Sequence, residues 1–344
     1  MKYSVIIPVY NRPDEVDELL QSLCQQTVKD FEVLIVEDGS QRDCKAVVDK
    51  YTDRLDVKYF MKPNSGPGQS RNYGAERAHG EWLIILDSDV VLPEGYLAAI
   101  ENSGQLTVAA FGGPDAAHPS FTPVQKAISY SMTSFFTTGG IRGGKAKLDK
   151  FYPRSFNMGI RRDVYQQLGG FSKMRFGEDI DFSYRIVEAG FRPRLFPEAW
   201  VWHKRRTDFR KFFRQVYNSG IARINLTKRH PGTLKLVHLL PTVFTLGVIG
   251  LILISAVGRA LMHYVDRDQF YWMCFAPWIP ILFYSLIICV DSTIRNRSLW
   301  VGLLSIPAAF VQLTGYGLGF IKSWWKRCVL KQDEFTAFEK NFYS

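Results

Sequence analysis

Short apolar runs alternate with segments of helical periodicity through the first part of the chain. The runs are Ser4–Val9, Glu32–Glu37, Val57–Met61 and Trp82–Leu86. They are too short to cross a membrane and are typical of strands buried on both faces. Between them the pattern predicts helices at 14–23 and 42–51 and a third that ends near His79. This alternation predicts an α/β fold, with an open, mostly parallel sheet and helices on both faces.

A different pattern begins near residue 206. Between 208 and 224, apolar residues recur every three or four positions with Arg and Lys between them. This pattern predicts a basic amphipathic helix that lies on a membrane interface or, alternatively, packs on the sheet domain. Three apolar runs follow at 236–258, 270–290 and 299–321. Each is near the roughly 20 residues that a helix needs to cross the hydrocarbon core.

The number of membrane crossings stays open at two or three. Three crossings would place the carboxyl tail on the far side, yet basic residues follow the third run: Lys322, Lys326, Arg327 and Lys331. Basic flanks normally stay inside. Pro307 and the alternating glycines at 315–319 make the third run a candidate for a re-entrant or interfacial segment.

The positive charge is concentrated beside the first apolar run. The chain of 344 residues carries a formal charge of +10, and the segment from His203 to Lys235 holds ten Lys and Arg against one Asp. This patch favours anionic lipid headgroups over nucleic acid. The amino terminus enters a strand directly, without a signal-peptide pattern, and the five cysteines show no Cys-x-x-Cys spacing. We therefore expect an inner-membrane (cytoplasmic membrane) protein whose first domain faces the cytoplasm.

Two carboxylates, Asp87 and Asp89, follow the strand at 82–86. Ligands of parallel sheets bind at the carboxyl ends of strands, and paired carboxylates suit a hard cation that holds a diphosphate. An ordinary polar turn is the alternative. The Gly-rich bend at 64–72 opens a helix with Arg71 in its first turn, which suits a phosphate group or only a tight turn. It has neither the Walker A ending nor the dinucleotide-binding glycine pattern, so ATPase and NAD-dependent functions lose support.

These motifs occur in an order that resembles the family 2 glycosyltransferases of GT-A fold, of the membrane-anchored bacterial type. The segments that carry the resemblance are Val5–Arg12, Val36–Ser40, Gly66–Asn72, Asp87–Asp89, Phe156–Arg162, Leu168–Phe171, Gly177–Asp181 and Trp202–Arg206. The resemblance implies an inverting, metal-dependent transferase that uses a nucleotide-diphosphate sugar. It does not choose the nucleotide or the sugar.

The resemblance also implies roles for individual residues. The donor side would comprise Pro8, Tyr10, Arg12, Asp38, Gly66, Arg71 and Asp87. Asp38 would accept a hydrogen bond from the donor's base, and Arg71 would face the phosphates. Asp89 and His203 would hold Mn²⁺ or Mg²⁺, and Asp179 would be the catalytic base. A helix cap is the alternative for Asp179, and a structural or surface role is the alternative for His203.

The resemblance and the apolar runs together predict the domains. These are a GT-A catalytic domain at 1–205, with a nucleotide-sugar half at 1–112 and an acceptor half at 113–205, an interfacial region at 206–234, transmembrane helices at 235–322 and a tail at 323–344. The glycines at 139–145 suit a mobile flap that orders over bound donor and acceptor, and a surface loop is the alternative.

The acceptor is expected to be lipid-linked or a glycan, and a soluble or protein acceptor stays open. Gln215–Ser219 departs from the Gln-x-x-Arg-Trp motif of processive synthases, which argues against processive synthesis. A nucleotidyltransferase and a non-catalytic membrane scaffold are the competing functions.

Overall fold

The computed structural model describes residues 1–104, 107–116, 118, 120–138, 151–204, 206–261 and 274–334. The chain divides into two compact units. The first contains Met1–His118 and Lys147–Lys204, and the second contains Pro119–Ala146 and Arg205–Glu334. Residues 120–138, which the sequence placed with the first domain, thus group with the second unit. The predicted flap at 139–145 lies outside the described residues.

The first unit is built on a seven-stranded sheet with the order β3-β2-β1-β4-β8-β6-β9. Its strands are β1 (Tyr3–Val9), β2 (Phe31–Asp38), β3 (Val57–Lys62), β4 (Trp82–Leu86), β6 (Ala110–Gly112), β8 (Asn157–Arg161) and β9 (Arg194–Leu195). The first four strands in the order are mutually parallel, whereas β8 is antiparallel to both β4 and β6. The prediction of an open, mostly parallel sheet is confirmed.

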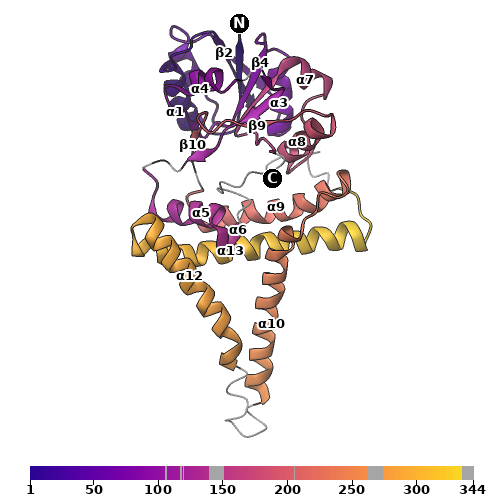
Figure 1. The fold of residues 1–344 in the computed structure, drawn as a ribbon. Coiled ribbons are helices and arrows are strands. Elements are labelled where there is room, and N and C mark those ends of the chain that lie inside the picture. The colour runs from indigo at the N-terminus through magenta and orange to yellow at the C-terminus, as the bar shows by residue number, and fades with distance from the viewer. Residues whose placement is uncertain are drawn as a thin grey trace. The chain divides into compact units, whose positions relative to one another are not determined.

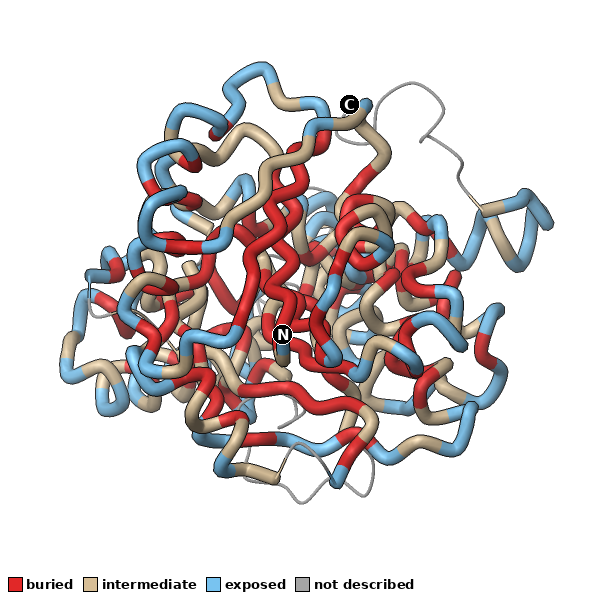
Figure 2. The backbone as a smooth tube through the Cα atoms, turned by 90° about the horizontal axis from the view of Figure 1, so that it is seen from above, coloured by how far each residue is buried: buried red, intermediate tan, exposed pale blue. Residues whose placement is uncertain are grey.

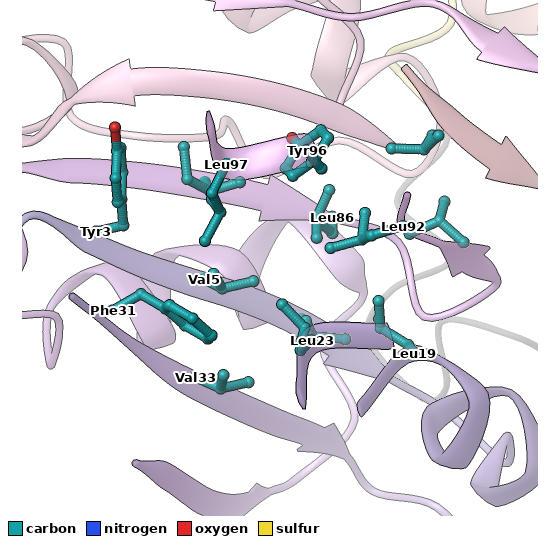
Figure 3. Close-up of a cluster of buried hydrophobic side chains, with 14 of the residues drawn as sticks. Tyr3, Val5, Leu19, Leu23, Phe31, Val33, Leu86, Leu92, Tyr96 and Leu97 are labelled. Atoms are coloured by element: carbon teal, nitrogen blue, oxygen red, sulfur yellow. The ribbon is translucent and has the colours of Figure 1, made fainter. Parts of the chain in front are cut away.

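Helices cover both faces of this sheet (Figure 1). One face packs against α1 (Pro13–Cys24) and α4 (Tyr96–Asn102), through a cluster that includes Val5, Leu23 and Leu97 (Figure 3). The other face packs against α3 (Pro67–Ala75), α7 (Arg162–Gln167) and α8 (Glu178–Glu188). The central strands are consequently buried along their length (Figure 2), which explains why their sequences are continuous apolar runs.

Two predicted helices differ in extent from the structure. The segment expected to be helical at 42–51 forms a short α2 (Lys45–Val48) and a 3₁₀ turn η1 (Asp49–Tyr51). The third helix, α3, ends at Ala75, four residues before the expected end. A small second sheet, β5 (Val90–Val91), β10 (Val201–His203) and β7 (Asp115–Ala116), lies in the same unit. It pairs His203 with Val90, directly after the two carboxylates that follow β4.

The second unit is helical in its described residues. Its helices are α5 (Pro123–Thr133), α6 (Phe135–Thr138), α9 (Phe209–Arg229), η3 (Leu236–His238), α10 (Leu240–Leu261), η4 (Ala276–Trp278), α12 (Ile279–Asn296), α13 (Leu299–Trp324) and the π-helix η5 (Trp325–Val329). Three of its helical stretches are long and apolar enough to cross a membrane, at Leu236–Leu261, Ala276–Asn296 and Leu299–Val329. They correspond to the three apolar runs of the sequence.

Candidate active site

The carboxyl ends of three adjacent strands bring the sequence motifs to one edge of the sheet. Strands β2, β1 and β4 are neighbours, and they end at Asp38, Val9 and Leu86. Asn11 joins the first two loops, because its N–H donates to Ser40 Oγ at 2.7 Å and its Oδ1 accepts from the backbone N–H of Gln41 at 2.8 Å. Asn11 has φ 55°, a left-handed conformation that asparagine tolerates better than most residues.

Asp87, Asp89 and His203 form a cluster at this edge. One potential ligand atom from each lies within 4.8 Å of the other two. His203 Nε2 is 3.2 Å from Asp89 Oδ1, and its Nδ1 is 4.0 Å from a carboxylate oxygen of Asp115. The Phe156 ring stacks on the imidazole, with the centroids 5.0 Å apart. The imidazole is thus held in place from two sides, with one nitrogen directed at Asp89.

Asp89 is buried but stays ionised. Burial opposes its negative charge, yet His203 and an ion pair with Arg12 outweigh that effect and hold the pKa of Asp89 well below its usual range. The same pair raises the pKa of Arg12 despite the partial burial of its guanidinium. A carboxylate that remains charged in a buried place is suited to hold a cation.

Arg71 lies in the interior, where it links two acidic motifs. Its side chain is 3% exposed, and its guanidinium donates to Asp87 Oδ1 at 2.8 Å and to Glu178 Oε1 at 3.0 Å. The Phe171 ring lies under the guanidinium, 5.1 Å from its carbon. Burial lowers the pKa of Arg71, but the two carboxylates raise it by more, so that the net effect is an increase. In this structure Arg71 therefore contacts carboxylates, where the sequence led us to expect that it faces phosphates.

Asp38 anchors the Gly-rich bend. Its carboxylate accepts from the backbone N–H of Gly66 at 2.8 Å and of Ser65 at 2.9 Å, and it pairs with Lys62. Gly66 caps α3 with φ 91°, a conformation that other residues rarely adopt. The buried Asp38 thus fixes the start of α3. The expected hydrogen bond to a donor's base stays a prediction.

Two further donor-side predictions lie next to this loop. Pro8 is buried within β1, opposite Val36 of β2, and Tyr10 is half-buried directly after the strand. They share the strand-end edge with Arg12 and Asp38. Their contact with a donor is a prediction that the protein chain alone does not test.

Asp179 lies in the first turn of α8, after Gly177 with φ 87°. Arg154 Nε donates to Asp179 Oδ2 at 2.7 Å. Burial raises the pKa of Asp179, but the charges of Arg154 and Arg71 outweigh it, so that the net effect is a pKa below the ordinary value. The adjacent Glu178 shows the opposite balance, because burial dominates over Arg71 and raises its pKa. The surroundings therefore favour the ionised form of Asp179 more strongly than that of Glu178.

Removing the Arg154 charge tests this electrostatic balance. In Arg154→Gln, burial is no longer offset by the ion pair, so the pKa of Asp179 should rise. The acid limb of the kcat/KM profile should move to higher pH, while Arg154→Lys should keep most of the wild-type profile. The control is Arg161→Gln, which removes an exposed arginine paired with Asp163. An acid limb that is the same in Arg154→Gln and wild type would contradict this account of Asp179.

The cluster fits a divalent metal ion by its donor chemistry. Two carboxylates supply the hard oxygen ligands that Mg²⁺ and Mn²⁺ accept, and the imidazole adds a nitrogen ligand. Mg²⁺ in proteins is bound mainly by oxygen, whereas imidazole suits transition metals. The donor set therefore favours Mn²⁺ over Mg²⁺.

Comparison with known proteins identifies the first part of the chain. Residues 4–169 match the model of the family described as glycosyl transferase family 2. These residues belong to glycosyltransferase family 2. An uncharacterised glycosyltransferase of Haemophilus influenzae is 31% identical over 199 residues, which cover 55% of this chain and 64% of that relative. An uncharacterised glycosyltransferase of Rickettsia felis is 43% identical over 88 residues, which cover 26% of this chain and only 15% of that relative.

A solved structure shares the fold. The mannosyltransferase of Pyrobaculum calidifontis, in complex with GDP-Man and Mn²⁺, matches with a TM-score of 0.58 over 95% of this chain and 88% of its own, at 14% identity. This likeness shows the fold alone, which is the GT-A architecture that the motif order implied.

Sequence reasoning missed several residues of the site. Arg154 and Asp115 lie outside the motifs, and Phe156 lies in one but was not expected to contact His203. Each of the three meets its partner only through folding. Glu178 was visible in the acidic motif, although not as the partner of Arg71.

Proposed function

We propose that the chain transfers a sugar from a nucleotide-diphosphate sugar to a hydroxyl or phosphate acceptor, with inversion at the anomeric carbon. The observation that carries the proposal is the link made by the buried Arg71. Arg71 connects Asp87, one of the three potential metal ligands, to Glu178, which directly precedes Asp179 in the chain. A donor-binding cluster and a candidate base are thereby held together in one unit.

Asp179 is proposed to act as the general base. It takes the proton from the acceptor hydroxyl as that oxygen attacks the anomeric carbon, and the bond from this carbon to the diphosphate oxygen breaks on the opposite face. One displacement inverts the configuration and needs no covalent sugar-enzyme intermediate. Arg154 keeps Asp179 ionised and oriented before the acceptor binds. An acceptor phosphate is already ionised and would not require this proton transfer.

The other residues are proposed to bind and orient the donor. Asp87, Asp89 and His203 would hold Mn²⁺ or Mg²⁺, which when bound would neutralise the charge of the diphosphate. Arg12, with Pro8 and Tyr10, would border the donor at the end of β1. Because Arg71 is engaged by two carboxylates, we assign it to positioning Asp87 and the start of α8, in place of direct phosphate contact.

The acceptor is proposed to be lipid-linked. Support comes from the three apolar helical stretches, which suit attachment to a membrane, and from the basic segment that precedes them. On this proposal the protein resides in the cytoplasmic membrane and builds a cell-surface glycan or glycolipid, with the family 2 unit facing the cytoplasm. The absence of a processive motif at Gln215–Ser219 suits the addition of single sugars.

Donor screening tests the proposal. The full chain in detergent is incubated with Mn²⁺, a panel of UDP-, GDP- and dTDP-sugars and membrane lipid extract, and products are identified by mass spectrometry. We expect a glycosylated lipid and a free nucleoside diphosphate, both absent without Mn²⁺. Pyrophosphate and a new nucleotide sugar, formed from a sugar phosphate and a nucleoside triphosphate, would indicate a nucleotidyltransferase instead. Failure to bind any donor would favour the non-catalytic scaffold.

A further inference from the structure

We infer that only α10 and α12 cross the bilayer, and that α13, apolar as it is, lies along the membrane surface beneath α9. Few residues of the two crossing helices are buried by the protein: Thr245 and Gly258 in α10, and Ile288 and Ser292 in α12. Of the most apolar window in each, only 6% of the first and 11% of the second is buried, against 44% for the stretch that contains α13. Side chains exposed all round a helix require a lipid environment, whereas α13 is covered on much of its circumference by protein.

The main cover on α13 is α9, and α5 adds to it along the first half of α13. Near one end, Phe209 packs in the cluster that contains Ala308, and near the other, Arg327 Nε donates to Asn225 Oδ1 at 3.1 Å. Between these ends the backbones nearly touch. A Cβ at Gly220 would lie 2.2 Å from the Tyr316 carbonyl oxygen, and a Cβ at Gly319 would lie 2.0 Å from that of Tyr217. Of the glycines that suggested a re-entrant segment, Gly315 and Gly319 therefore form this close contact with α9, whereas Gly317 meets Pro241 and Thr245 of α10.

Because α9 and α13 are in close contact, the charged residues of α9 limit how deeply α13 can lie in the bilayer. Five basic residues of α9 are exposed: Arg210, Lys211, Arg214, Lys228 and Arg229. If α13 crossed the bilayer, α9 would be carried through it, and Arg214 and Arg223 near its middle would enter the hydrocarbon core. Charges at that depth are strongly unfavourable. At the membrane surface the five exposed residues reach water and anionic headgroups instead.

The remaining contacts of α13 agree with a surface position. Helix α10 meets it through Pro241 and Thr245 in its first two turns, and α12 meets it through residues such as Cys289 and Thr293 in its second half. The start of α10 and the end of α12 thus contact α13, and the segment that connects the two helices lies at their opposite ends. Within this unit α13 runs across α10 and α12 (Figure 1).

The open face of α13 is apolar. Leu299, Leu303 and Pro307 are exposed at intervals of four positions, Leu318 is exposed eleven positions later, or about three helical turns, and Trp325 seven positions after that, so all five lie near one face. Trp300 and Trp324 are exposed beside this face. Lys322 and Lys326 are exposed near the carboxyl end of the helix. An apolar stripe with aromatic and basic residues at its end is typical of a helix that lies in the headgroup region of an anionic bilayer. The occupant of this face is therefore the lipid surface.

Helix lengths and flanking charges support two crossings. At 1.5 Å per residue, α10 and α12 are about 33 and about 27 Å long, near the ~30 Å of the hydrocarbon core. Two crossings return the chain to its starting side. The basic residues after α13 then lie on the same side as those of 204–235, as the positive-inside tendency requires.

Cysteine labelling in oriented vesicles tests the inference on the full chain. Native Cys328, exposed after α13, is labelled with a membrane-impermeant maleimide, and labelled peptides are identified by mass spectrometry. In a Cys328→Ser background, Lys50→Cys reports the side of the first unit and Asp268→Cys the side of the α10–α12 connection. Neither Cys328 nor Lys50 belongs to the proposed site.

We expect Cys328 and Lys50→Cys to label in the same vesicle orientation and Asp268→Cys in the opposite one. Labelling of Cys328 together with Asp268→Cys would establish three crossings and overturn the inference. So would the absence of labelling at Cys328 from both sides, since that result would place the residue inside the bilayer. The outcome is independent of transferase activity, so the proposed function can fail while the topology holds.

Discussion

Replacing Asp179 with asparagine is expected to lower kcat about 10³-fold while leaving donor binding unchanged. Asparagine keeps the size of the side chain and its contact with Arg154, but it cannot take a proton from the acceptor. General-base catalysis contributes about 10²–10⁴-fold, and a loss of 10³-fold corresponds to about 4 kcal/mol of transition-state stabilisation. The measurement is steady-state transfer with a saturating donor, alongside calorimetric donor binding in the presence of Mn²⁺.

The matched control for this variant is Glu188→Gln, an exposed carboxylate at the other end of α8. It should transfer sugar at the wild-type rate. If Asp179→Asn did the same with a hydroxyl acceptor, the base assignment would be wrong. If the variant lost activity only with hydroxyl acceptors and kept it with an acceptor phosphate, the base would be confirmed, because a phosphate needs no deprotonation.

The Asp89→Asn variant should lose metal binding and, with it, metal-dependent donor binding. Asp89 is the buried carboxylate of the cluster, and its ionised state is maintained by His203 and Arg12. Neutralising it removes a ligand charge and leaves the Arg12 cation without its carboxylate partner beside the same site. Mutating a residue that only supports a metal ligand typically lowers metal affinity about 10–100-fold. Because Asp89 would be a ligand itself, we expect Mn²⁺ affinity to fall by more than about 100-fold. The electron paramagnetic resonance signal of free Mn²⁺ measures this directly.

The control here is Asp163→Asn, a carboxylate that is 63% exposed and paired with Arg161 outside the cluster. Its Mn²⁺ titration should match wild type. A thermal melt without metal shows whether Asp89→Asn remains folded. A folded variant with wild-type Mn²⁺ affinity would remove Asp89 from the metal site, whereas a weaker loss in His203→Gln would show that the imidazole is a secondary ligand.

The local pattern of the sequence predicted much of the fold. A run such as Trp82–Leu86 is apolar throughout because helices cover both faces of its strand, so its burial is recorded in its own residues. The end of α3 was less predictable. Residues 76–79 continue a helix-compatible sequence, and the chain leaves the helix at Ala75 for contacts with β1 and β2, which are remote in sequence.

The sequence by itself determined the strand-and-helix alternation, the apolar helical stretches and the order of the motifs, which brings Asp87 and Asp89 to a strand end. Only the tertiary structure decided what these groups contact. It gave Arg71 two carboxylate partners, paired Arg154 with Asp179 over 25 positions and covered α13 with α9. The physical reason is that periodicity reports how one segment divides its surface between solvent and protein. It does not report which distant segment covers that surface, and so the depth of α13 and the ionisation of Asp179 follow from packing alone.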